Sequence, residues 1–283
     1  IFDPDVLLRS FAELGLTGED YRRWQGMAGQ PNGILLVTGP TGSGKTTTLY
    51  STLKQLATSE VNVCTIEDPI EMVEPAFNQM QVQSNIDVSF ASGVRALLRQ
   101  DPDIIMIGEI RDIETAEMAI QAALTGHLVI STLHTNDAPT AITRLLDLGV
   151  PSYMIKATLL GVMAQRLVRT LCPHCKVEEP VDEEAWQHLT APYRVKAPKQ
   201  MHSATGCLEC RDTGFLGRAG IYEILPLTES LKSLITDDLD VEALRTGAMK
   251  DGMRTLRLSG AQKVGAGLTT AAEVLRVAPV VAS

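Results

Sequence analysis

The sequence predicts an α/β fold in which a mostly parallel β-sheet is covered by helices on both faces. From Gly33 onward, short apolar segments alternate with amphipathic segments of helical periodicity. Such alternation is typical of strand and helix units in a parallel sheet. A glycine-rich loop at residues 39–46 joins the first of these strands to the first of these helices, the position that phosphate-binding loops take in α/β proteins.

The amino-acid composition indicates an ordinary globular protein. The chain has 283 residues, 45% of them apolar and 21% charged, an ordinary globular balance. A formal net charge of -9 argues against general binding to nucleic acid, which relies on positive surface charge. No apolar run reaches the roughly 18 to 20 residues that span a bilayer, so we expect a cytoplasmic protein without a transmembrane segment. The chain begins with Ile1 rather than Met, and we therefore expect a fragment of a longer protein.

The first 171 residues are expected to form a linker followed by the core of the α/β domain. Residues 1–32 are predicted as a linker that closes a missing N-terminal domain, with helices at 6–14 and 19–27 before Pro31-Asn32-Gly33 breaks the chain. Residues 33–171 are predicted as the core. Apolar runs predict strands and periodic segments predict helices: strands at 34–38, 62–67, 104–108 and 128–132, and helices at 44–57, 90–99, 113–124, 138–148 and 151–171. The last helix rests on the spacing of Ile155, Leu159 and Met163.

The character of the sequence changes after the core. Residues 172–218 are polar, contain three prolines between two cysteine pairs, and are predicted as a small inserted module. Residues 219–283 are predicted as a helical C-terminal subdomain. Periodicity there indicates a strand at 221–225 and helices at 229–235, 241–250, 254–264 and 271–277.

The loop between the first strand and helix predicts a nucleotide site. Its residues are Gly39-Pro40-Thr41-Gly42-Ser43-Gly44-Lys45-Thr46, followed by Thr47. Glycines let backbone N–H groups converge on a phosphate, and the helix N-terminus adds positive potential. Lys45 would span the β- and γ-phosphates of ATP, and the Thr46 hydroxyl would ligate Mg²⁺. The alternative is a glycine-rich turn with an incidental lysine.

Polar side chains follow three of the other predicted strands. Glu109 emerges where the strand at 104–108 ends, and could hold Mg²⁺ through water. Glu67 ends the strand at 62–67 and Asp68 and Glu71 follow it, and each of the three could position or deprotonate the attacking water. An acidic strand end can equally be a solvated turn or a helix cap.

His134 follows the strand at 128–132. It could contact the γ-phosphate and respond to its loss, or be a hydrogen-bonded loop histidine. His127, at the start of that strand, is predicted to be structural.

Four of the five cysteines form two C-x₂-C pairs, Cys172 with Cys175 and Cys207 with Cys210, separated by 31 residues. Each pair can present two thiolates to one ion, and four thiolates complete a tetrahedral zinc shell. A dithiol redox pair and four unliganded thiols are the alternatives. Cys64, on a predicted strand, is expected to be a small buried apolar residue.

Four segments together resemble the secretion ATPases of the type II secretion system and the type IV pilus, over nearly the whole chain. They are the phosphate loop at 39–46, an aspartate box at 65–71, an atypical Walker B segment at 104–112 and a histidine box at 126–135. The resemblance implies a RecA-like P-loop NTPase fold. It also implies that Glu71 is the water-activating base, that Glu109 coordinates magnesium and that His134 contacts the γ-phosphate.

The resemblance further implies a ring of six subunits, with nucleotide between this motor domain and a preceding domain that supplies arginines. It implies a cytoplasmic protein held peripherally on the inner membrane by a platform protein. Since the preceding domain is absent from this sequence, we expect the fragment to bind ATP but to hydrolyse it slowly. The four-cysteine module is implied to mark assembly members rather than retraction members.

Four hypotheses about function follow. The leading one is an ATPase that drives pseudopilus assembly and protein secretion. The alternative within the class is an ATPase that extends a type IV pilus. A nucleic-acid motor for DNA uptake or conjugation is disfavoured by the acidic balance. A nucleotide-gated docking module without turnover is the non-catalytic alternative.

Overall fold

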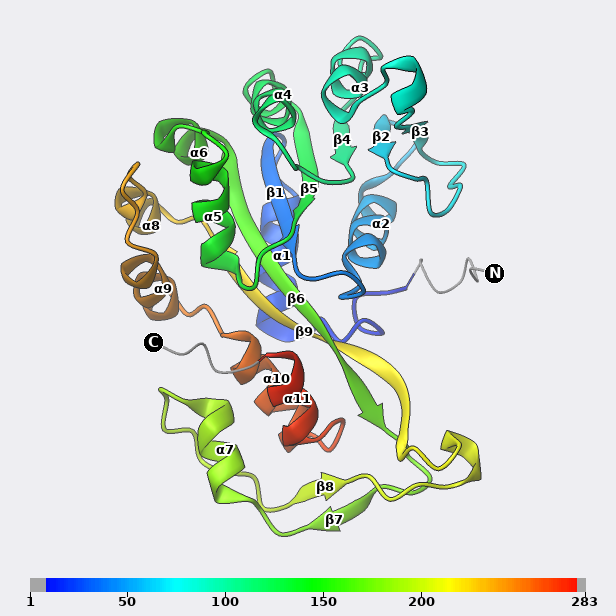
Figure 1. The fold of residues 1–283 in the computed structure, drawn as a ribbon, viewed down its shortest axis with the longest axis vertical. Helices are drawn as coiled ribbons and strands as arrows, with labels where there is room; N and C mark the ends of the chain where they lie inside the picture. Colours follow the sequence, from blue (N-terminus) through cyan, green and yellow to red (C-terminus); the bar gives the residue numbers. More distant parts are fainter. Residues whose placement is uncertain (1–8, 279–283) are drawn as a thin grey trace.

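A computed structural model describes residues 9–278. Its main element is a seven-stranded sheet with the order β3-β2-β4-β5-β1-β6-β9 (Figure 1). Neighbouring strands are parallel except β6 and β9, which form an antiparallel pair. The strands are β1 Gly33–Thr38, β2 Val63–Glu67, β3 Asn78–Gln81, β4 Ile104–Ile107, β5 Leu128–Leu133, β6 Leu159–Leu171 and β9 Phe215–Pro226. The predicted α/β fold with a mostly parallel sheet is confirmed.

Helices cover both faces of the sheet because its strands are apolar on both sides. In β1, Ile34 and Leu36 belong to one buried cluster, which includes side chains of α3 (Phe90–Leu97), α4 (Ile113–Leu124) and α5 (Ala138–Asp147). The alternate residues, Leu35 and Val37, belong to a second cluster with α1 (Gly18–Ala28) and α2 (Lys45–Leu56). Successive side chains of a strand point to opposite faces, so the two clusters are the two layers of core.

The helix expected at 151–171 is the main error in the predicted core. A helix, α6 Ser152–Thr158, is followed directly by the 13-residue strand β6. This strand lies between β1 and β9 and is buried on both faces over most of its length. A strand of this kind shows no alternation of apolar and polar residues, and the apolar spacing in this segment happened to match a helix.

Three further differences concern the ends of the core. Strand β3, residues 78–81, was not predicted because its sequence Asn-Gln-Met-Gln is polar and it lies at the exposed edge of the sheet. Strand β9 begins at Phe215, before the predicted strand, so the sheet includes residues from both the predicted module and the predicted C-terminal subdomain. The helix expected at 6–14 falls partly outside the described residues, and residues 11–15 form a turn. The four-part division stays a prediction.

Residues 172–214 connect β6 to β9. They contain a two-stranded antiparallel sheet and one α-helix that packs against two C-terminal helices (Figure 1). The elements are β7 Val177–Glu179, α7 Glu183–Thr190, β8 Met201–Ser203 and the 3₁₀ turn η3 Leu208–Cys210, and the C-terminal helices are α8 Glu229–Leu234, α9 Val241–Lys250, α10 Leu256–Gly265 and α11 Ala271–Val277. Trp186 and Leu189 of α7 are buried against α10 and α11, which fixes the module to the core.

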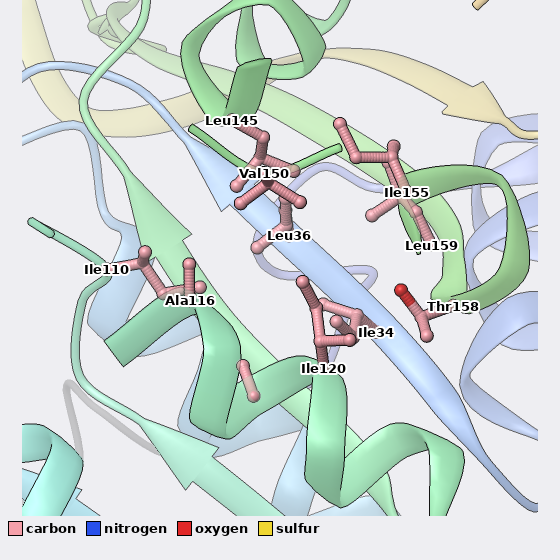
Figure 2. A pocket seen from close by; sticks show the side chains of 11 residues that line it. Ile34, Leu36, Ile110, Ala116, Ile120, Leu145, Val150, Ile155, Thr158 and Leu159 are labelled. Carbon is pink, nitrogen blue, oxygen red and sulfur yellow. The ribbon is translucent and has the colours of Figure 1, made fainter. Parts of the chain in front are cut away.

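A small apolar cavity lies between β1 and helices α4, α5 and α6 (Figure 2). Its volume is about 10 Å³, and Thr158 is its one polar lining residue. That volume is close to the minimum for one water molecule, so the cavity is a packing defect rather than a ligand site. Across residues 9–278, no helix is both long enough and apolar enough to cross a membrane.

Candidate functional site

The glycine-rich loop lies between β1 and α2, as the sequence predicts. Gly39 has a φ angle of +154°, and a Cβ atom there would lie 2.5 Å from the carbonyl oxygen of Gln165. Gly44 has a φ angle of +87°, which side chains rarely adopt. Helix α2 begins at Lys45, so its free N–H groups and its positive end point into the loop. The loop therefore has the shape and polarity of an anion site.

The remaining loop residues divide by exposure. Pro40, Thr41 and Gly42 are exposed, Thr46 and Thr47 are half-buried on the first turn of α2, and Ser43 is buried. The Lys45 ammonium donates to the carbonyl oxygens of Gly39 at 2.8 Å and Pro40 at 3.1 Å. Burial lowers the pKa of Lys45, while the nearby carboxylates of Glu109 and Glu71 oppose this effect.

Gln165 of β6 is hydrogen-bonded to the phosphate loop and to α2, and the sequence analysis did not identify it. Its amide nitrogen donates to the carbonyl oxygen of Ser43 at 2.9 Å, and its amide oxygen accepts from the Thr48 hydroxyl at 2.8 Å. The side chain is 1% exposed. One signal was present, since Gln165 is a polar residue inside an apolar run, and buried polar groups are held by hydrogen bonds.

Glu71 lies at the phosphate loop. Its carboxylate accepts a hydrogen bond from the Thr46 hydroxyl at 3.3 Å. Glu67, four residues earlier, is only 4% exposed and accepts hydrogen bonds from Tyr50 and Thr65, both at 2.6 Å. The two carboxylates, which spacing alone left equivalent, thus face different surroundings.

Glu109 and His134 are brought together at the ends of neighbouring strands β4 and β5. The His134 Nε2 atom lies 3.5 Å from a carboxylate oxygen of Glu109. Burial and the charge of Lys45 lower the pKa of His134, although Glu109 opposes them, which favours the neutral imidazole. Arg111 contacts Glu109 and lies 3.8 Å from Asp68, which neutralises part of this acidic cluster.

A cavity of about 420 Å³ opens beside the phosphate loop. Four arginines line it together with loop residues 40–43: Arg166, Arg169, Arg218 and Arg276. Glu273 forms ion pairs with Arg169 at 2.6 Å and Arg276 at 3.0 Å. Within the described part of the chain, no acidic partner lies within ion-pair distance of Arg218. The cavity is therefore electropositive, a feature that the sequence did not predict because its arginines are far apart in the chain.

The four predicted cysteines converge at one point. Their sulfur atoms all lie within 4.8 Å of one another. The Sγ–Sγ distances are 3.9 Å for Cys172 and Cys207, 3.8 Å for Cys175 and Cys210, and 3.7 Å for Cys207 and Cys210. Four ligands at about 2.3 Å from a tetrahedral zinc would be about 3.8 Å apart.

Backbone donors support the same cluster. The N–H groups of Cys207 and Gly214 point to the sulfur of Cys210, both at 3.2 Å. Such bonds stabilise thiolates and orient them around a metal. The residues present therefore fit a structural zinc ion. Cys64 lies apart from them, fully buried in β2, as predicted.

Comparison with known proteins gives a consistent result. A family described as "Type II/IV secretion system protein" matches residues 1–276. The chain is 61% identical over 279 residues to a type IV pilus assembly ATPase, TfpB, of Acinetobacter baylyi, covering 99% of this chain and 48% of that protein. It is 46% identical over 277 residues to the type II secretion system ATPase E of Vibrio cholerae, covering 98% of this chain and 54% of that protein.

The chain thus spans about half the length of the curated relatives it matches. Among solved structures, the pilus retraction motor PilT with bound ADP superposes with a TM-score of 0.69 at 29% identity. That alignment covers 96% of this chain and 68% of PilT. The structural similarity therefore extends over most of this chain.

Proposed function

Since the chain belongs to the type II/IV secretion system protein family, we propose that it is the ATP-hydrolysing motor segment of a machine that assembles filaments of pilin-like subunits. The observation that supports this proposal most directly is the convergence of four predicted groups. The phosphate loop, Glu71, Glu109 and His134 lie at the carboxyl ends of β1, β2, β4 and β5, where ligands bind in parallel sheets.

Each group has a chemical role in the proposed reaction, the conversion of ATP and water to ADP and phosphate. Bound Mg²⁺ would supply positive charge to the phosphates. The hydroxyl of Thr46 and, through water, the carboxylate of Glu109 would hold that ion. The ammonium of Lys45 would neutralise phosphate charge.

Two further groups would act on the water and the γ-phosphate. Glu71 would accept the proton of the attacking water. His134, whose neutral form is favoured because burial lowers its pKa, would donate a hydrogen bond to the γ-phosphate.

The arginine-lined cavity extends this site. It shares residues 40–43 with the phosphate loop, so a nucleotide bound at the loop would lie next to it. We infer that Arg218 contributes charge to the nucleotide, because no acidic side chain of residues 9–278 neutralises it. The further arginines implied by the family would come from outside this chain.

The four cysteines would hold one zinc ion, whose role would be to stabilise the connection between β6 and β9. We also propose that the full-length protein is a ring of six subunits, located on the cytoplasmic face of the inner membrane through a platform protein. The relatives support these statements only through the family to which they belong.

Two candidate processes fit this motor. The first is pseudopilus assembly for protein secretion, supported by several relatives named as type II secretion system proteins at 46–50% identity. The second is extension of a type IV pilus, supported by the relative at 61% identity. Deletion of the gene separates them: loss of an exported enzyme with surface pili intact indicates the first, and loss of pili with secretion intact indicates the second.

Glu71→Gln tests the reaction itself. In the full-length protein we expect the kcat for ATP hydrolysis to fall at least 100-fold while the affinity for ATP changes less than twofold, because the amide cannot accept a proton but keeps the size of the side chain. Lys45→Ala is the control that should abolish ATP binding. An unchanged kcat in Glu71→Gln would refute the proposed base.

A further inference from the structure

One face of α2 carries three polar side chains spaced four residues apart, Thr46, Tyr50 and Lys54. Residues at this spacing lie one above another on a helix. All three contact the loop that carries Glu71. The Tyr50 hydroxyl donates to Glu67 at 2.6 Å, and the Lys54 ammonium donates to Glu74 at 2.7 Å, while Thr46 contacts Glu71 at the top of the series.

Tyr50 also reaches the backbone beside Glu71. Its hydroxyl lies 3.1 Å from the carbonyl oxygen of Met72, the residue that follows Glu71. Gln79 of β3 donates to the same carbonyl oxygen at 2.9 Å. The Met72 carbonyl oxygen thus accepts a hydrogen bond from Gln79 of the edge strand, and the Tyr50 hydroxyl, whose single proton points to Glu67, packs beside it from the helix.

The same groups form one closed network. The amide nitrogen of Gln79 also lies 3.0 Å from the Tyr50 hydroxyl and 3.1 Å from Glu67, and its amide oxygen accepts from the backbone N–H of Glu74 at 2.8 Å. Tyr50 is fully buried and Glu67 nearly so. Burial, together with Glu67, raises the pKa of Tyr50, so the phenol remains a donor. Buried networks of this kind are costly to disrupt because water cannot replace the lost partner.

We propose that Tyr50 and Gln79 are positioning residues, which fix the backbone at Met72 and so hold the Glu71 carboxylate against Thr46. This inference rests on the proposed function, in which Glu71 activates water. Glu67 then anchors the network and is not itself the base. A displacement of about 1 Å in a catalytic group can slow a reaction about 100-fold, so loss of these contacts should affect turnover more than nucleotide affinity.

Tyr50→Phe tests the inference, because it removes one hydroxyl and leaves the ring packed. In the full-length protein we expect kcat to fall about tenfold and the KM for ATP to change less than twofold. In a Glu71→Gln background the same substitution should cause no further loss, because Tyr50 acts only through Glu71. Gln79→Leu, at the half-buried edge strand, should give the same pattern.

Tyr222→Phe is the matched control. The Tyr222 hydroxyl is also buried and donates to a backbone oxygen, that of Leu14 at 2.8 Å, but it lies outside the network. We expect its kcat to match that of the wild type. If Tyr50→Phe leaves kcat unchanged, or lowers it by an equal factor in both backgrounds, the positioning role is wrong. An unchanged rate for Glu71→Gln alone would instead refute the proposed function, so the two failures are distinguishable.

Discussion

At the scale of single residues, buried carboxylates in this chain differ in character because their partners differ. Two arginines contact Glu273, and they hold its pKa at about 2. Glu223 of β9 is buried and forms no direct ion pair with any of residues 9–278, and burial raises its pKa to about 7. Its carboxylate accepts from the backbone N–H of Ala138 at 2.8 Å, the first residue of α5. Glu223 therefore joins β9 to the helix that follows His134.

The elevated pKa of Glu223 predicts a pH-dependent stability. A group whose pKa is higher in the folded state stabilises the fold below its unfolded value, near 4.5, and this contribution is lost as the pH rises through about 7. Relative to Glu223→Gln, the wild-type free energy of unfolding should fall by about 3 kcal/mol between these pH values. Urea unfolding from pH 5 to pH 8 measures the difference. A difference that stays constant with pH would contradict the prediction.

The sequence could name the candidate residues at this scale but could not rank them. The sequence alone does not distinguish Glu67, Asp68 and Glu71 as candidate bases. In the structure their surroundings differ, because they contact Tyr50, Arg111 and Thr46, respectively. Gln165 was missed for a related reason. Its partners at Ser43 and Thr48 are more than 100 positions away, and a side chain's partners at such distances are set by the fold rather than by local pattern.

At the scale of elements, β6 and β3 show where periodicity fails. The predicted helices and strands with clear flanking signals were correct to within a few residues, such as α4 with its Asp112 cap and α5 with its Asp137 cap. Strand β6 is buried on both faces and β3 is polar and at the edge. Neither gives the alternating pattern by which a half-buried strand is recognised.

The cysteine cluster gives a prediction about one element, the connection from β6 to β9. Purified protein should contain one zinc ion per chain, and Cys207→Ser should lower the zinc content below about a tenth of that value, because three thiolates leave the tetrahedral shell incomplete. Proteolysis should then cleave within residues 172–214. Cys64→Ala, which removes a buried thiol outside the cluster, should keep its zinc. A folded, metal-free wild type with four titratable thiols would show the assignment to be wrong.

At the scale of the whole molecule, the parallel order β2-β4-β5-β1 explains why the nucleotide site could be predicted. Adjacent parallel strands end at the same edge, so groups that follow them in sequence must meet. The arginine-lined cavity could not be predicted in this way. It combines β6, β9 and α11, and the antiparallel pairing of β6 with β9 was absent from the prediction.

The extent of the chain leads to a prediction about turnover. The chain covers about half the length of its relatives, and the proposed function places further arginines outside it, so we expect this chain alone to bind ATP with an affinity within tenfold of the full-length protein. Its kcat should be at least 100-fold lower, since arginines that complete a phosphoryl-transfer site contribute about 10³-fold or more. Equal kcat values for the two proteins would indicate that residues 1–283 form the whole site.

The path from β6 to β9 has a consequence for how such proteins diverge. These strands are antiparallel neighbours in the sheet, so the four-cysteine segment between them is, in topological terms, a long hairpin loop. A deletion that replaced it with a tight turn would leave the order of all seven strands intact. The deletion would destabilise the fold at α10 and α11, because α7 packs against them and their apolar surface would become exposed. Descendants that lost the segment would therefore be expected to carry compensating polar substitutions on those two helices.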